Sequence, residues 1–238
     1  MTSLTSVAMT ISPASFDNAE LLERVRANLA RVRERIEASG RDATSVRVVA
    51  VTKTFGVEHV SAALALGITD IGENYVDELC EKRAAAGDAA VSWHFLGTLQ
   101  SNKIARAVRC ADVLSTVARV KELERIAALA PGKVIDVQVD YGQDRGRNGA
   151  APGDVGEIVR RARALGLIVL GLMVVAPPGD AATRRAFLAT IALANEWGLV
   201  ERSMGMSDDL EQACELGTTE VRLGRALFGP RSSEGRLT

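Results

Sequence analysis

A lysine closes a run of small and β-branched residues early in the chain. In "VVAVTKTFG" (48–56), Lys53 follows a stretch typical of a buried strand, and no acidic residue stands beside it. A partly desolvated amine at the inner end of a strand is a nucleophile that forms Schiff bases with carbonyl compounds. A lysine that simply extends its amine into solvent fits the same position, and this stretch alone favours that ordinary role.

A possible anion site lies in "SMGMSDDLEQACELG" (203–217), which predicts a strand end, a glycine turn and a helix beginning near Ser207. Ser207 suits the N-cap position, and the backbone N–H groups of that first turn could hold a phosphate. An ordinary capped helix explains the pattern at least as well. Asp208 and Asp209 would have to point away from a bound phosphate, because carboxylates repel it.

A second candidate for anion binding is "RLGRALFG" (222–229). Gly224 lets the backbone approach an anion closely, and the loops after strands 7 and 8 of a (β/α)₈ barrel commonly grip a phosphate. Arg222 lies two residues earlier and would face the same side of the last strand. It needs an acceptor, either an aspartate in a structural ion pair or a heteroatom of a ligand.

Two further polar residues lie in or just after predicted strands. Asn74 in "GENY" (72–75) could line a site or cap a helix, and His94 follows a tryptophan in an apolar stretch, where a histidine is more often a satisfied core residue. A Schiff-base lysine, a phosphate site after the last two strands and an arginine beside it suit a phosphorylated aldehyde cofactor. Pyridoxal phosphate (PLP) is the cofactor that this combination indicates.

The elements that must position these residues alternate along the chain. An amphipathic helix is predicted over 18–39, and Ala/Leu/Glu/Arg-rich helical stretches separate the strands that follow it. Strands alternating with helices predict parallel βαβ units, and eight units suit a (β/α)₈ TIM barrel with an extra N-terminal helix. A doubly wound open sheet is the alternative. The eight predicted strands cover 46–52, 67–72, 91–97, 111–117, 133–140, 167–175, 199–205 and 219–224.

Length and composition limit the class of protein. The 238 residues, 47% of them hydrophobic, predict one domain (1–238), with the barrel over 46–229 and a tail over 230–238. A net charge of −1 and 4% aromatic residues disfavour nucleic acid or an anionic membrane as partner. No apolar run suits a membrane span, no secretory signal is visible, and we expect a cytoplasmic protein. The cysteines Cys80, Cys110 and Cys214 lie far apart, which predicts unpaired, buried thiols and no metal site.

The residues resemble a known family, the pyridoxal phosphate homeostasis proteins. These are relatives of the alanine racemase N-terminal barrel, in the fold type III group of PLP proteins. The matching stretches run in order over about 180 residues. They are "AVTKT" (50–54), "GENYVDEL" (72–79), "WHFLGTLQSNK" (93–103), "GLMVVAP" (171–177), "SMGMSDDLEQACELG" (203–217) and "VRLGRALFG" (221–229).

The resemblance implies a role for each matching residue. Lys53 would carry PLP as a Schiff base, Arg222 would face the pyridine nitrogen, and Ser207, Gly224 and Arg225 would hold the phosphate, largely through backbone groups. An arginine cannot give up its proton, so the pyridine nitrogen would stay unprotonated and the ring would be a weaker electron sink. The residues assigned to the cofactor site are Lys53, Asn74, His94, Ser207, Arg222, Gly224 and Arg225.

Three departures from the family pattern concern the loops. Arg147 stands in "RGRNG", where family members often have Lys-x-Gly, and Val174 replaces the threonine of the usual "GLMT". The stretch between "APPGD" and "SMGMS" looks short, which predicts a trimmed helix there. These departures concern loop contacts and leave the lysine unaffected.

Three functions fit the residues. The first is a PLP carrier or reservoir, a monomer that acts in PLP homeostasis, influences amino-acid and keto-acid pools and passes PLP transiently to apoenzymes. The second is an amino-acid racemase with Lys53 as catalytic base, which needs an opposing acid/base, usually a tyrosine from a second domain. Only Tyr75 and Tyr141 are available, and the missing domain favours the carrier. The third is a lysine-dependent aldolase, which would be colourless as purified.

Overall fold

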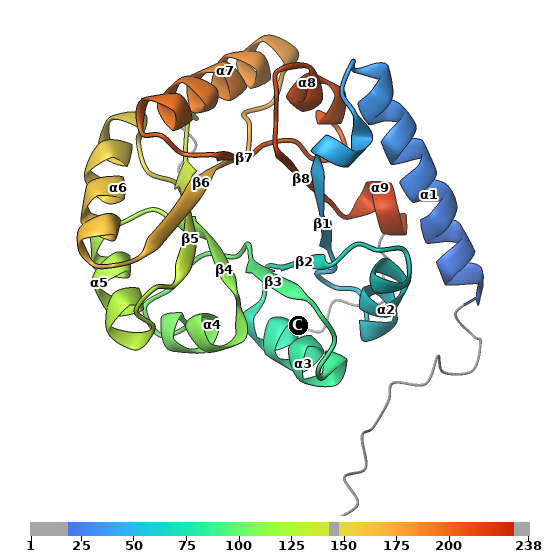
Figure 1. Cartoon of the computed structure of the whole chain (residues 1–238), viewed down its shortest axis with the longest axis horizontal. Coiled ribbons are helices and arrows are strands. Elements are labelled where there is room, and N and C mark those ends of the chain that lie inside the picture. The colour runs from blue at the N-terminus through green and yellow to red at the C-terminus, as the bar shows by residue number, and fades with distance from the viewer. Residues whose placement is uncertain (1–18, 143–147, 231–238) are drawn as a thin grey trace, which may run out of the picture.

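A closed barrel forms the centre of the molecule in the computed structural model, which describes residues 19–142 and 148–230. Eight parallel strands follow one another around the ring in chain order, and helices surround them (Figure 1). The first and last strands pair directly, with Arg47 opposite Glu220 and Ala50 opposite Leu223. This pairing closes the sheet, so the predicted TIM barrel is confirmed and the open sheet is wrong.

All eight predicted strands are present. Parallel strands covered by helices are buried on both faces, and therefore appear in the sequence as continuous β-branched runs. They are β1 (Arg47–Val51), β2 (Asp70–Glu73), β3 (Ser92–Phe95), β4 (Val113–Val117), β5 (Val134–Val139), β6 (Ile168–Val174), β7 (Glu201–Ser203) and β8 (Glu220–Leu223).

The helices that cover the barrel follow the strands in turn (Figure 1). Short 3₁₀ turns precede β1 at Ala43–Ser45 and α6 at Pro152–Asp154. The helices are α1 (Ala19–Ala38), α2 (Val57–Ala65), α3 (Val76–Ala86), α4 (Ile104–Cys110), α5 (Val120–Leu129), α6 (Val155–Ala164), α7 (Asp180–Glu196), α8 (Leu210–Glu215) and α9 (Arg225–Phe228).

Helix α1 is the extra N-terminal helix that the sequence predicts. Its apolar residues recur every three or four positions, which places them on one face. That face packs against α2, α8 and α9 beside the point where β1 meets β8 (Figure 1). The buried residues of the face are Leu21, Val25, Leu29, Val32 and Ile36.

Two predictions about the outer layer are wrong. Cys80 in α3 and Cys110 in α4 form a disulfide, with 5.2 Å between their Cα atoms, because neighbouring barrel helices bring distant positions together. Only Cys214 matches the predicted buried, unpaired thiol. Helix α7 has 17 residues, so the segment between β6 and β7 holds a long helix instead of a trimmed one.

Some predictions concern residues outside the described ranges. Arg147 and nearly all of the predicted tail, from residue 231 on, fall there. Among residues 19–142 and 148–230, no helix is long and apolar enough to cross a membrane. The same residues contain no cluster of three or more histidine, cysteine or acidic side chains that could hold a metal ion.

Candidate functional site

A cavity of about 600 Å³ opens at the carboxyl ends of the strands. That is the face where (β/α)₈ barrels carry their chemistry, and the volume is typical of small-molecule sites. Six of the seven residues assigned from the sequence line this cavity, whereas His94 does not. The six are Lys53, Asn74, Ser207, Arg222, Gly224 and Arg225.

Lys53 reaches the cavity from the turn between β1 and α2. The preceding residue, Thr52, is fully buried and its N–H donates to the Gly72 carbonyl at 3.0 Å. The following residue, Thr54, has a φ of +66°, which costs energy for a β-branched residue. Lys53 therefore sits between a buried anchor and a strained position.

The loops after β7 and β8 meet at the other side of the cavity. The Ser207 hydroxyl accepts a hydrogen bond from the Ala226 N–H at 3.2 Å, so the two loops are joined at the start of α9. Arg225 forms an ion pair with Asp208 at 2.5 Å, and the Asp208 side chain is 80% exposed. The carboxylate at this end of the cavity is thus paired with a guanidinium and turned toward solvent.

The helix after this turn starts later than the sequence predicts. Asp209 occupies the cap position of α8, which begins at Leu210, so the prediction that Ser207 caps this helix is wrong. Asp209 accepts a hydrogen bond from the Met206 N–H at 2.5 Å, which closes the turn locally. Ser207 is thereby left to contact the neighbouring loop.

Arg222 is the buried cation of the cavity. Its Nη1 donates to the carbonyl and the hydroxyl of Ser203 at 2.7 and 2.6 Å, and its Nη2 donates to the Val174 carbonyl at 2.7 Å. Its acceptors are therefore carbonyl and hydroxyl oxygens. The sequence allowed an aspartate as the acceptor, and no aspartate among the described residues takes that role. Burial lowers the pKa of Arg222, although Glu220, Asp209 and Asp136 oppose that shift.

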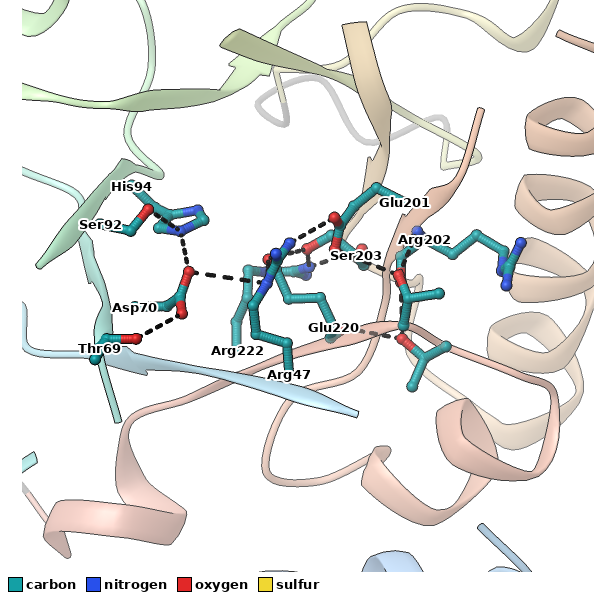
Figure 2. Close-up of polar contacts among 12 residues, drawn as sticks. Arg47, Thr69, Asp70, Ser92, His94, Glu201, Arg202, Ser203, Glu220 and Arg222 are labelled. Carbon is teal, nitrogen blue, oxygen red and sulfur yellow. Dashed lines mark hydrogen bonds and ion pairs between the residues drawn. The ribbon is translucent and has the colours of Figure 1, made fainter. Parts of the chain in front are cut away.

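A chain of polar contacts continues from Arg222 through the barrel interior (Figure 2). The Ser203 hydroxyl donates to Glu220 at 2.6 Å, and Glu220 accepts from Arg47 at 2.8 Å. Arg47 also forms an ion pair with Glu201 at 2.5 Å. Arg222 is thus fixed from beneath by groups that do not line the cavity themselves.

His94 belongs to this interior chain. Its Nε2 lies 2.9 Å from Asp70 at the amino-terminal end of β2, and Asp70 lies 3.8 Å from Arg47 (Figure 2). Although burial lowers the pKa of His94, the Asp70 hydrogen bond and the charges of Glu220, Asp70 and Asp136 raise it above its ordinary value. His94 is therefore a buried core residue, as its sequence context favours, bonded through Nε2 while its Nδ1 has no hydrogen-bond partner among the described residues.

Three comparisons bear on the family. The model of the alanine racemase N-terminal domain matches residues 21–232. The pyridoxal phosphate homeostasis protein of Pseudomonas aeruginosa is 36% identical over 220 residues, 89% of this chain and 96% of the relative. Its Escherichia coli K12 counterpart is 32% identical over 224 residues, covering 86% and 95%.

Solved structures agree. PipY of Synechococcus elongatus, in its structure with PLP bound, is 32% identical with a TM-score of 0.70, covering 83% of this chain and all of PipY. An alanine racemase of Streptomyces coelicolor, at 24% identity, shares the fold with a TM-score of 0.71, covering 87% of this chain and 58% of the racemase. The chain belongs to the pyridoxal phosphate homeostasis protein family.

The residues of this family member fit PLP. An amine, a buried guanidinium, a seryl hydroxyl and the backbone of a helix start converge on one cavity, and these are the groups that an aldehyde, a heteroaromatic ring and a phosphate need. A Cβ atom added to Gly224 would lie 3.2 Å from the Val51 carbonyl, so a larger residue there would crowd the cavity wall.

Apolar residues of the site escaped the sequence-based prediction. Met173 and Leu96 line the cavity but resemble ordinary core positions in the sequence, because hydrophobic type alone does not tell a cavity wall from a core. Val174, in contrast, was singled out from the sequence but lies in the core. Its side chain lies in a buried cluster with Phe187 and Met204, so the hydroxyl missing at this position does not belong to the cavity wall.

Proposed function

We propose that this protein binds PLP and acts in PLP homeostasis as a carrier or reservoir, with Lys53 as the residue that bonds the cofactor. The observation that carries the proposal is the convergence of Lys53, Arg222 and the joined loops at Ser207 and Gly224 on one cavity. The family membership and the PLP-bound PipY structure support the same cofactor.

Each group at the cavity has a distinct task in this proposal. When bound, PLP supplies an aldehyde that forms a Schiff base with an amine. Lys53 provides that amine, and the loops at Ser207, Gly224 and Arg225 hold the phosphate. Arg222 donates hydrogen bonds but gives up no proton, so a ring nitrogen held beside it would stay unprotonated and carbanion chemistry would be weakly supported.

The positions of both tyrosines favour the carrier over a racemase. Neither residue lines the Lys53 cavity: Tyr75 is 53% exposed beside a neighbouring pocket, and the Tyr141 hydroxyl accepts a hydrogen bond from Thr190 at 3.2 Å. Burial raises the pKa of Tyr141, although that hydrogen bond opposes the shift. No tyrosine of this chain therefore stands opposite Lys53 as the second acid/base that racemisation requires.

Borohydride reduction of the PLP-loaded protein, followed by peptide mapping, tests the site. We expect a single label on Lys53 and a yellow protein, and Lys53→Ala should lose both. Lys103→Ala is the matched control, because Lys103 lines the neighbouring pocket and not this cavity. A label on another lysine would overturn the assignment of the site, and a colourless protein that takes up no PLP would favour an aldolase.

Exchange of hydrogen at Cα separates the carrier from the racemase. We expect L-alanine incubated with the loaded protein in deuterated water to exchange no faster than with free PLP. Turnover far above that level would support the racemase instead. Loss of colour from the loaded protein as an apoenzyme gains activity would support transfer to partner enzymes.

Several finer points belong to this proposal. We propose a cytoplasmic monomer of one domain that contacts PLP-dependent apoenzymes only transiently and influences amino-acid and keto-acid pools. Sedimentation of the loaded protein, alone and with an apoenzyme, measures its mass and its association.

A further inference from the structure

A buried ion cluster lies directly behind the turn that carries Lys53. We call it the α3 clamp: Glu73 at the end of β2, with Glu78 and Lys82 in α3. The Lys82 ammonium donates to Glu73 at 2.6 Å and to Glu78 at 2.9 Å. The side chain of Lys82 is 8% exposed and that of Glu73 is fully buried. Such a buried lysine is uncommon and needs a partner for each of its donors.

The α3 clamp bonds both chain neighbours of Lys53. Lys82 donates its third hydrogen bond to the Thr52 carbonyl at 2.7 Å, and the Thr52 hydroxyl donates to Glu73 at 2.6 Å. On the other side, Glu78 accepts a hydrogen bond from the Thr54 N–H at 2.9 Å. The turn is therefore held immediately before and immediately after the lysine that the proposed function makes the attachment point.

The contact at Thr54 explains a strained backbone. Thr54 is the only residue other than glycine with a positive φ in the part of the chain that the structure describes. A β-branched residue keeps such a conformation only where surrounding contacts enforce it, and strain of this kind gathers at functional positions. Glu78, held by Lys82, supplies the enforcing contact.

The α3 clamp does not line the Lys53 cavity. Glu78 and Lys82 instead border a separate hollow on the far side of the turn, together with Thr54 and Phe55. An effect of these side chains on PLP would therefore pass through the backbone of residues 52–54. We propose that Lys82, together with Glu73 and Glu78, is a positioning residue that presents the Lys53 amine to PLP.

This inference rests on the proposed function. Two ligands separate an effect on bonding to Lys53 from an effect on binding of the ring and phosphate. PLP has the aldehyde that bonds Lys53, whereas pyridoxine 5′-phosphate has the same ring and phosphate without it. Lys82→Met should weaken PLP binding and slow borohydride labelling of Lys53 by about tenfold or more, because a small misplacement of a reacting group is costly. Its affinity for pyridoxine 5′-phosphate should match that of the native protein. Lys82→Arg should recover part of the PLP affinity.

The matched control is Arg83→Met, one residue along the same helix. Arg83 donates a hydrogen bond to Asp112 at 2.9 Å, which ties α3 to the segment between α4 and β4. Removing the Arg83 side chain therefore perturbs α3 without touching the Lys53 turn. Arg83→Met should retain native PLP affinity. If it loses PLP binding to the same degree as Lys82→Met, the role of Lys82 is structural and the proposal fails.

A double variant tests whether a loss of PLP binding is caused by a loss of folding. Lys82→Met leaves the buried Glu73 carboxylate without its cation, so the double variant Lys82→Met/Glu73→Gln removes both charges and still frees the Thr52 carbonyl. It should show the same selective loss of PLP binding, with thermal unfolding of the PLP-free protein confirming the fold. Equal loss for both ligands, or no loss for either, would overturn the positioning role. A native protein that binds no PLP would instead refute the proposed function.

Discussion

Asp136, in β5, is a carboxyl buried inside the barrel. Burial raises the pKa of its carboxyl to about 7, and the charges of Glu220 and Glu201 act in the same direction, while His94 opposes them. Its ordinary value is 3.8, so between about pH 4 and 7 the folded protein holds a proton here that the unfolded chain has released. The free energy of unfolding therefore falls as pH rises through that window.

Asp136→Asn should remove this pH dependence, because an asparagine resembles the protonated acid and carries no titrating proton. Relative to the native protein, the variant should gain stability from about pH 4 to 7 by up to about 1.4 kcal/mol per pH unit. Urea unfolding at several pH values measures the difference. A difference that does not change with pH would show that this carboxyl does not titrate there.

The family's usual threonine can be restored at Val174. Val174→Thr should lower the free energy of unfolding by about 1–3 kcal/mol, because its hydroxyl would enter an apolar cluster. PLP affinity should stay unchanged, since the Val174 carbonyl still accepts from Arg222. Val200→Thr, at a position that is 72% exposed, is the control and should be nearly neutral. A gain in PLP affinity for Val174→Thr would contradict this view.

At the scale of elements, the loops after β2 and β3 meet in a very close backbone contact. A Cβ atom on Gly97 would lie 1.9 Å from the carbonyl oxygen of Asn74, a residue that lines the cavity. The Gly97 carbonyl is held in turn by the Thr116 hydroxyl at 2.6 Å, so the loop after β3 cannot easily yield. A glycine is needed at Gly97 for this close approach.

Gly97→Ala should therefore displace the Asn74 loop and weaken PLP binding, with a loss of about 1–3 kcal/mol in stability from overpacking. Thermal unfolding and PLP titration of the variant measure the two effects. Gly153→Ala serves as the control, because a Cβ atom there would meet nothing within 4 Å. Native behaviour of both variants would mean that the loop adapts at little cost.

The elements were more predictable than the contacts between them. Each strand could be found because burial on both faces demands continuous β-branched runs, and the cavity residues Lys53, Asn74 and Arg222 could be placed because strand ends converge in a barrel. Ser207 was assigned the wrong partner, since its contact with Ala226 joins loops 19 positions apart. The α3 clamp was missed for the same reason: Lys82 bonds Thr52, 30 positions away.

At the scale of the whole molecule, one disulfide joins two neighbouring helices of the outer layer. The disulfide between Cys80 and Cys110 joins α3, which carries Glu78 and Lys82, to α4. It closes a chain segment with a sequence separation of 30, which limits the freedom of the unfolded chain. The contribution of this link to stability can be measured without altering the cavity.

Reduction of the protein should lower the free energy of unfolding by about 2–4 kcal/mol. Denaturant unfolding with and without dithiothreitol measures the loss. The double variant Cys80→Ser/Cys110→Ser should unfold with the stability of the reduced protein, and reductant should not change it further. Equal stability of the native protein with and without reductant would show that the link adds nothing.

The same link determines how a nicked molecule would behave. The segment between Cys80 and Cys110 includes β3 and the loop that holds Gly97 against Asn74. A protease cut within that segment would leave two fragments that migrate together on a gel without reductant and separate with it. Limited digestion run both ways would therefore show in one experiment whether a sample carries the bond and whether the segment between the two cysteines was open to cleavage.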